Sequence, residues 1–188
     1  MGVPSGYTSG QVVQAVPTGI NSALVFITGA SFSAVTSVSL PTSTFSSTYE
    51  NYLVSFNLST AVSTATMTLR LRESGTDSST GAYNNMLSNV TNVNTSSIIG
   101  TNTATSFNYG TISASTTYNT LIQVRAPNLA QRTNLYTNQF FEITGTSQNG
   151  VFGAQNFGNT NQFDSLTLIS SVASNITGTY KVYGYVNS

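Results

Sequence analysis

The chain is poor in charged residues. Lysine, arginine, aspartate and glutamate make up only 5% of its 188 residues, and the formal net charge is +0, whereas ordinary globular proteins carry about 25% charged residues. Nucleic-acid binding needs a concentrated basic surface, and the five basic residues are scattered along the chain. We therefore expect no nucleic-acid partner. A near-neutral surface also repels its own copies weakly, which favours association.

Histidine and cysteine are absent. Without cysteine there are no disulfides and no thiolate metal sites, and without histidine the commonest general base and metal ligand is missing. The usual form of a serine triad is excluded for the same reason. The single lysine, Lys181, has no phosphate-binding glycine loop beside it. We expect a protein that is not an enzyme and that holds no cofactor and no metal.

Five acidic residues leave two minor alternatives. Some pair of carboxylates could serve a glycosidase. Asp77 lies in a loop rich in hydroxyl groups, and these oxygens could bind calcium. A solvated turn, in which Asp77 bonds its own backbone, is the simpler interpretation.

Long apolar runs are also missing. The most apolar early stretch, residues 23–27, is far shorter than the roughly 20 residues that span a bilayer. The N-terminus lacks the basic region and apolar run of a signal peptide. We expect no membrane partner and no classical leader.

The residues that are present suffice for a folded core. The hydrophobic fraction is 39%, with ten Tyr and ten Phe, and a chain of this length can bury roughly 70% of its unfolded surface in one domain. Residues 1–21 are interrupted by glycine and proline, so they are predicted to form an extended arm ahead of a domain at 22–188. The apolar arm residues are predicted to dock on a neighbouring subunit, with a frayed terminus as the alternative. They are Tyr7, Val12, Val13 and Val16.

Strands are predicted wherever apolar and polar residues alternate. The pattern is clearest at residues 52–58 and 67–71, which the polar segment 59–64 is expected to join as a hairpin. Gly29 is expected to separate two earlier strands. The other predicted strands cover residues 22–28, 32–40, 107–112, 118–126, 139–147, 166–172 and 180–186, with those at 107–112 and 118–126 forming a pair.

The intervening segments complete the prediction. Asn149-Gly150 is typical of a two-residue hairpin turn, and residues 73–81 have the composition of a loop. Residues 82–104 show no clear period and are predicted to be an ordered excursion or a functional loop. With no amphipathic helix and no fixed repeat, eight to ten strands indicate an all-β fold, a single β-sandwich domain with jelly-roll or Greek-key-like connections.

Arg70 and Arg72 share the polar face of one predicted strand. Either Glu50 or Glu73 could pair with them. Because charges are so few, these arginines are predicted to bind a partner and fix the register of the contact.

Three tyrosines lie near the C-terminus. Alternation places Tyr183 and Tyr185 on one face of the last strand and Tyr180 on the other. Packing in the core or in an interface is the favoured interpretation, with carbohydrate stacking as the alternative.

Four segments resemble a known class of proteins. They are FSSTYENY at 45–52, MTLRLRESGTD at 67–77, Tyr83-Asn84, and ITGTYKVYGY at 176–185. Together they resemble small virion structural proteins of tailed phages, those of marine and cyanobacterial phages in particular. Such proteins serve as capsid decoration or cement proteins, as knobs or as tail-fibre parts.

The resemblance implies a virion protein that is made in the host cytoplasm and placed on the capsid exterior. We expect a decoration or cement protein that binds the major capsid protein, self-associates, with a trimer favoured, and stabilises the capsid lattice. The alternative is a tail-fibre or receptor-binding domain that recognises a host-surface glycan.

Overall fold

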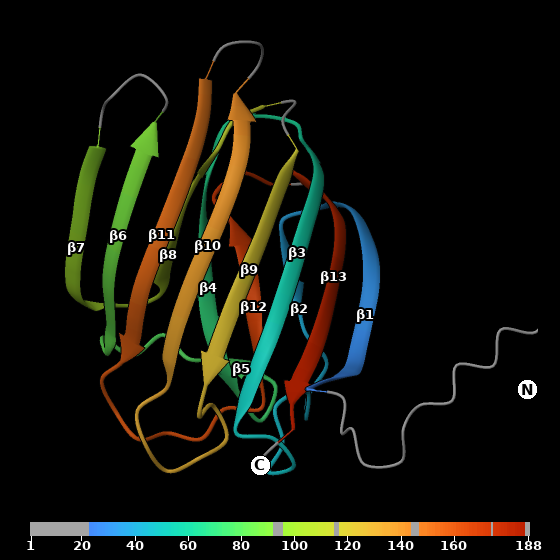
Figure 1. Cartoon of the computed structure of the whole chain (residues 1–188), viewed down its shortest axis with the longest axis vertical. Helices are drawn as coiled ribbons and strands as arrows, with labels where there is room; N and C mark the ends of the chain where they lie inside the picture. The colour runs from blue at the N-terminus through green and yellow to red at the C-terminus, as the bar shows by residue number, and fades with distance from the viewer. Residues whose placement is uncertain (1–22, 92–95, 115–116, 144–146, 174, 187–188) are drawn as a thin grey trace, which may run out of the picture.

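The computed structural model describes residues 23–91, 96–114, 117–143, 147–173 and 175–186. The predicted arm, with Tyr7, Val12, Val13 and Val16, lies outside the described residues. Within the described ranges the chain forms thirteen strands and no helix. The strands make two antiparallel sheets that lie face to face (Figure 1). This arrangement confirms the predicted all-β sandwich.

The larger sheet has eight strands and the smaller has five. In spatial order the larger sheet consists of β1 (Leu24–Val35), β13 (Ile176–Tyr185), β3 (Asn51–Ala61), β9 (Tyr118–Arg125), β10 (Asn134–Ile143), β11 (Ser147–Phe157), β6 (Tyr83–Thr91) and β7 (Ser96–Ala104). The smaller sheet consists of β2 (Ser37–Ser39), β12 (Ser165–Ser170), β4 (Ala65–Glu73) and β5 (Thr76–Asp77), with β8 (Phe107–Ile112) paired to β4. Neighbouring strands are often far apart in sequence, as Greek-key-like connections require.

The core lies between the two sheets and follows from the alternation. In β9 every second residue, from Tyr118 to Val124, is buried, and the residues between them are exposed. Leu69 and Leu71 of β4 are fully buried from the opposite side. Aromatic rings fill much of the space between the layers, because each buries a large apolar area. The largest fully buried side chains are Tyr52, Tyr83, Tyr109, Tyr118, Phe45, Phe56, Phe107, Phe157 and Phe163.

The predicted hairpin across residues 59–64 is wrong. β3 belongs to the larger sheet and β4 to the smaller, so this connection crosses from one layer to the other. Asn175 holds the crossing, since its side-chain oxygen accepts the Ser63 N–H at 2.7 Å and its backbone oxygen accepts the Val62 N–H at 3.1 Å. The alternation of apolar and polar residues shows that both strands bury one face, but it does not indicate which strands pair. The expected pairing of residues 107–112 with 118–126 is wrong for the same reason, because β8 and β9 lie in different sheets.

Gly29 does not end a strand. β1 runs through it, and a Cβ at this position would lie 2.8 Å from the Tyr180 carbonyl oxygen. Glycine is therefore required by the close approach of the neighbouring β13 backbone. The strand predicted at 32–40 is divided instead after Val35, and its second half joins the smaller sheet as β2.

The tight turn also lies elsewhere than predicted. Gly150 pairs with Phe140 inside the β10–β11 ladder, so Asn149-Gly150 is strand rather than turn. Ser74 and Gly75, with φ of 51° and 76°, form the two-residue turn between β4 and β5, because both central residues of such a turn take positive φ. Residues 82–104 contain the β6–β7 hairpin. This hairpin and the short β2 and β5 raise the strand number above the expected eight to ten.

Candidate binding surfaces

Arg70 and Arg72 lie on the outer face of the smaller sheet. Their neighbours Leu69 and Leu71 point into the core, so alternation places both arginines outside. Both are partly buried there. The predicted polar face of this strand is confirmed.

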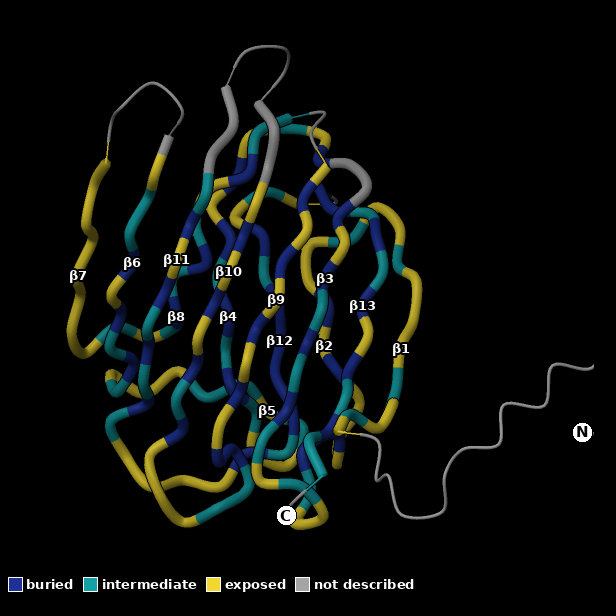
Figure 2. Tube along the Cα trace, viewed as in Figure 1, coloured by how far each residue is buried: buried dark blue, intermediate teal, exposed yellow. Residues whose placement is uncertain are grey.

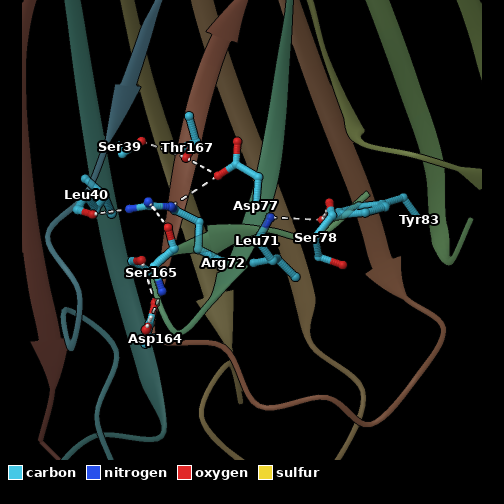
Figure 3. Close-up of polar contacts among 11 residues, drawn as sticks. Ser39, Leu40, Leu71, Arg72, Asp77, Ser78, Tyr83, Asp164, Ser165 and Thr167 are labelled. Atoms are coloured by element: carbon cyan, nitrogen blue, oxygen red, sulfur yellow. Dashed lines mark hydrogen bonds and ion pairs between the residues drawn. The ribbon is translucent and has the colours of Figure 1, made fainter. Parts of the chain in front are cut away.

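The guanidinium of Arg72 is held within its own chain (Figure 3). Its Nε lies 3.1 Å from Asp77 Oδ1, and one terminal nitrogen donates to the Leu40 carbonyl oxygen at 3.2 Å. The other terminal nitrogen donates to the Gly75 carbonyl oxygen. The expected pairing of Arg72 with Glu50 or Glu73 is wrong, because the β4–β5 turn brings Asp77 directly opposite Arg72. These contacts assign Arg72 mainly to fixing this turn.

The carboxylates around Arg72 are also engaged. Thr167 Oγ1 donates to Asp77 Oδ1 at 2.6 Å, and the Gly75 N–H donates to Asp164 Oδ2 at 3.2 Å. Asp77 is therefore the ion-pair partner of Arg72, and its Oδ1 also accepts a hydrogen bond from Thr167. Among the described residues no three acidic side chains gather in a metal-binding group.

Tyr83 ties the two sheets together beside this network. Its hydroxyl donates to the Ser78 carbonyl oxygen at 2.8 Å and accepts the Leu71 N–H at 3.1 Å (Figure 3). Its ring makes edge contacts with Phe107 and Phe157 at centroid distances of 4.6 and 4.9 Å. Burial raises the pKa of Tyr83 to about 12, although both hydrogen bonds act in the opposite direction. Burial is also the main cause that raises the pKa of Tyr52 and Tyr109.

The outer face of the larger sheet exposes several large apolar side chains. Eight of the eleven large hydrophobic side chains that the described residues expose lie on β9, β10, β11, β6 and β7. Seven of them are on the outer side of the sheet and form what we call the apolar face. They are Met86, Val90, Ile98, Leu121, Tyr136, Phe140 and Phe152.

Register places these side chains on neighbouring strands, with polar residues between some of them. Leu121 pairs with Asn138, which pairs with Phe152, which in turn pairs with Ser88. The rings of Phe140 and Phe152 meet edge to face at 5.7 Å. Large exposed apolar side chains that gather on one face of a sheet indicate a binding surface.

The described side chains of this face carry little charge. Among the side chains that the structure describes on these five strands, Arg125 is the one that carries a charge. Its guanidinium carbon lies 5.2 Å from the centroid of the Tyr136 ring. Sequence reasoning missed the apolar face because Phe140 and Phe152 look like core residues. Their neighbours in the two strands, Gln139 and Val151, are buried. Because successive side chains of a strand point to opposite faces, the two phenylalanines point outward.

A cleft of about 320 Å³ lies beside the apolar face. It is lined by Asn51, Tyr52, Gln123, Val124, Arg125 and Tyr185. Tyr183 is also on the outer side, with its ring centroid 5.7 Å from that of Phe26. Tyr180 is buried, and its ring packs against Phe56. The predicted alternation of these tyrosines is confirmed. Because Tyr180 belongs to the core, the three tyrosines do not form a continuous stacking ladder.

Comparison with known proteins gives no relative for this chain: no family model matches it, and searches of curated proteins and of solved structures return no match. The described residues include no helix long and apolar enough to cross a membrane. The class of protein is therefore defined by the fold and its surfaces, as an antiparallel two-sheet β-sandwich with one broad apolar outer face.

Proposed function

We propose that this protein is a structural subunit of a tailed-phage particle, a capsid decoration or cement protein that binds the outer surface of the major capsid lattice and stabilises it. The observation that carries the proposal is the apolar face, which is exposed in the single chain and carries little charge among its described side chains. The sequence resemblance to virion structural proteins points the same way. In this proposal the protein performs no catalysis and needs no cofactor.

The proposed mechanism is burial of surface that matches the lattice in shape. A stable interface removes roughly 800 Å² from each partner, and each Å² of apolar surface contributes about 25 cal/mol before the costs of association. Seven large side chains on one face can supply the centre of such an interface. Copies that associate as trimers at threefold positions would brace neighbouring capsid subunits against internal pressure.

Attachment is expected to resist salt. At about 1 M NaCl the Debye length falls to roughly 3 Å, so contacts that depend on exposed charge are lost, whereas apolar burial is not weakened. Purified particles should therefore retain this protein after a high-salt wash, measured by gel densitometry of the sedimented particles. Release at high salt with retention at low salt would overturn the mechanism.

A matched pair of variants tests whether the apolar face is the surface that binds the capsid. Phe140→Ser removes an apolar side chain that is 61% exposed on the apolar face. Val62→Ser removes one that is 72% exposed but lies away from that face, in the connection from β3 to β4. Only Phe140→Ser should lower the number of copies per particle. The wild-type number should match the capsid lattice, and a count typical of a tail would sink the decoration proposal.

The cleft favours one second candidate, recognition of a host-surface glycan by a receptor-binding domain. Tyr185 offers a ring, and Asn51, Gln123 and Arg125 offer the amide and guanidinium groups that sugars bond. If the cleft binds a sugar, Tyr185→Ala should abolish binding to a glycan array, whereas Tyr183→Ala should not. Specific glycan binding that depends on Tyr185 would place the receptor role ahead of decoration.

A further inference from the structure

The strand β7 is an open edge of the larger sheet. It ends the strand order beside β6, and every residue from Ser96 to Thr103 is exposed. An edge strand presents unpaired N–H and C=O groups, and proteins usually protect such edges with lysine, proline or a covering segment. The sequence of β7, SSIIGTNTA, contains neither a charge nor a proline. β7 is therefore a template for a further strand.

Each face of β7 exposes one isoleucine. Ile98 pairs with Ser88 on the outer side and is 78% exposed, while Ile99 pairs with the inward-facing Leu87 and is 38% exposed. β7 extends past the smaller sheet, which lies behind the middle of the larger one, and its trace is exposed except at its last residue (Figures 1 and 2). A strand that adds to this edge with an apolar side chain on each face would cover both isoleucines.

We propose that residues 11–16 of one copy add as a strand to β7 of a neighbouring copy. This segment reads QVVQAV, is uncharged, and is bounded by Gly10 and Pro17. Val12 and Val13 are consecutive, so in an extended strand they point to opposite faces, as Ile98 and Ile99 require. Addition of a strand to an open edge is a common way in which proteins bind peptide segments.

The length of the chain assigns the segment to a neighbour. Val16 and Leu24 are eight residues apart, so they can be separated by at most about 29 Å. Leu24 begins β1, at the opposite edge of the sheet from β7. A strand added beyond β7 would lie eight strand spacings from β1, or about 38 Å. The segment therefore falls short of its own β7.

The other edge of the larger sheet, β1, is a poorer acceptor. β1 carries register shifts between Phe26 and Thr28 and between Phe32 and Val35. Such bulges interrupt the row of hydrogen-bonding groups and blunt an edge. β7 has a regular register from Ser96 to Thr101. Folding of the segment back on its own β1, and direct pairing of β7 with β7 of a second copy, are the two rival arrangements.

The proposed contact runs head to tail. The arm leaves at the β1 edge of one copy and binds the β7 edge of the next, so donor and acceptor are different surfaces. Contacts of this kind close into rings when the rotation between copies permits, and a trimer is one such ring. The contact forms between copies of the chain itself, so its failure and the failure of capsid binding are separate results.

Cross-linking tests the contact directly, because the chain has no cysteine of its own. A full-length chain with Val12→Cys is co-expressed with a size-tagged full-length chain with Ile98→Cys and treated with a short bismaleimide. A cross-link between the two chains is expected. In the control, Val62→Cys replaces Ile98→Cys at a comparably exposed position, and no cross-link is expected. Cross-links solely between two Ile98→Cys chains would establish β7–β7 pairing instead, and absence of any link between chains would refute the contact.

Sedimentation of the purified protein, without capsids, provides the second measurement. Wild-type chain and Val62→Lys should sediment as the same oligomer. Ile98→Lys and Val12→Lys should sediment as monomers, because a lysine at either position cannot be buried in the added strand. Thermal unfolding of Ile98→Lys as a single cooperative transition shows that it remains folded. A wild-type monomer, or an Ile98→Lys variant that stays oligomeric, would overturn the proposal.

Discussion

Gly178→Ala is expected to abolish folding at physiological temperature or to lower the free energy of unfolding by about 3 kcal/mol or more, the range of severe overpacking. Gly178 is buried in β13, between β1 and β3. A Cβ at this position would overlap the Asn57 carbonyl oxygen and lie 2.9 Å from the Leu58 Cα. Both are backbone atoms, so no side-chain rotation relieves the clash.

The cost is large because the clash falls where the ladder is already irregular. The register between β13 and β3 shifts between Thr177 and Gly178, and this bulge brings the β3 backbone against Gly178. Relief requires separation of two neighbouring strands of the larger sheet. A typical domain is stable by only 5–15 kcal/mol, so loss of this pairing removes a large share of the total.

Gly100→Ala is the matched control. Gly100 is exposed in β7, and the nearest atom to its added Cβ is the Asn85 carbonyl oxygen at 3.9 Å. Alanine also restricts the unfolded chain, so this change should be neutral or slightly stabilising. Urea unfolding followed by intrinsic tyrosine fluorescence measures both variants. Equal midpoints for Gly178→Ala and wild type would show that the β3–β13 approach is wider than described.

Which face of a strand is buried can be predicted well from the sequence. Tyr52, Val54 and Phe56 alternate with partly buried residues, and all three are fully buried as predicted. The alternation of buried and exposed residues is a local property, so it can be predicted from the sequence of one strand alone. The same holds for β4 and for β13, where the predicted faces are those observed.

Pairing between strands is not local and was largely missed. The crossing after β3 depends on Asn175, which lies more than a hundred residues further along the chain. Likewise, Asn149-Gly150 has the local signal of a turn, but pairing with Phe140 and Phe141 holds it in a ladder. The turn at Ser74-Gly75 has a weaker local signal, yet it is positioned by the contact between Gly75 and Asp164. Tertiary contacts override local preference at each of these places.

For the candidate binding surfaces, too, the direction of a side chain can be predicted from the sequence, whereas its partners cannot. Alternation placed Arg70 and Arg72 outside, but the ion pair of Arg72 with Asp77 follows from the β4–β5 turn. The apolar face combines residues from five strands that are brought side by side only by sheet order. Its members look like core residues in sequence, because hydrophobicity alone does not tell a buried core from an interface awaiting a partner.

Tyr83→Phe is expected to lower the free energy of unfolding by about 1–3 kcal/mol, because it leaves the buried Leu71 N–H without its partner. The pH dependence of stability reports the burial of the same hydroxyl. Because the folded pKa of Tyr83 is about 12, above its ordinary value of 10.0, its neutral form is favoured in the folded state. This contribution is fully present below about pH 10 and is lost between pH 10 and 12, by up to about 1.4 kcal/mol per pH unit.

The difference in unfolding free energy between wild type and Tyr83→Phe should therefore be constant near neutral pH and narrow between about pH 10 and 12. Tyr52 and Tyr109, whose pKa values burial also raises, should leave the variant with a residual alkaline loss of its own. Urea unfolding at a series of pH values, followed by far-ultraviolet circular dichroism, gives both curves. Parallel curves through this range would mean that the Tyr83 hydroxyl ionises as freely in the folded protein as in the unfolded chain, and that it is not buried between the two sheets as described.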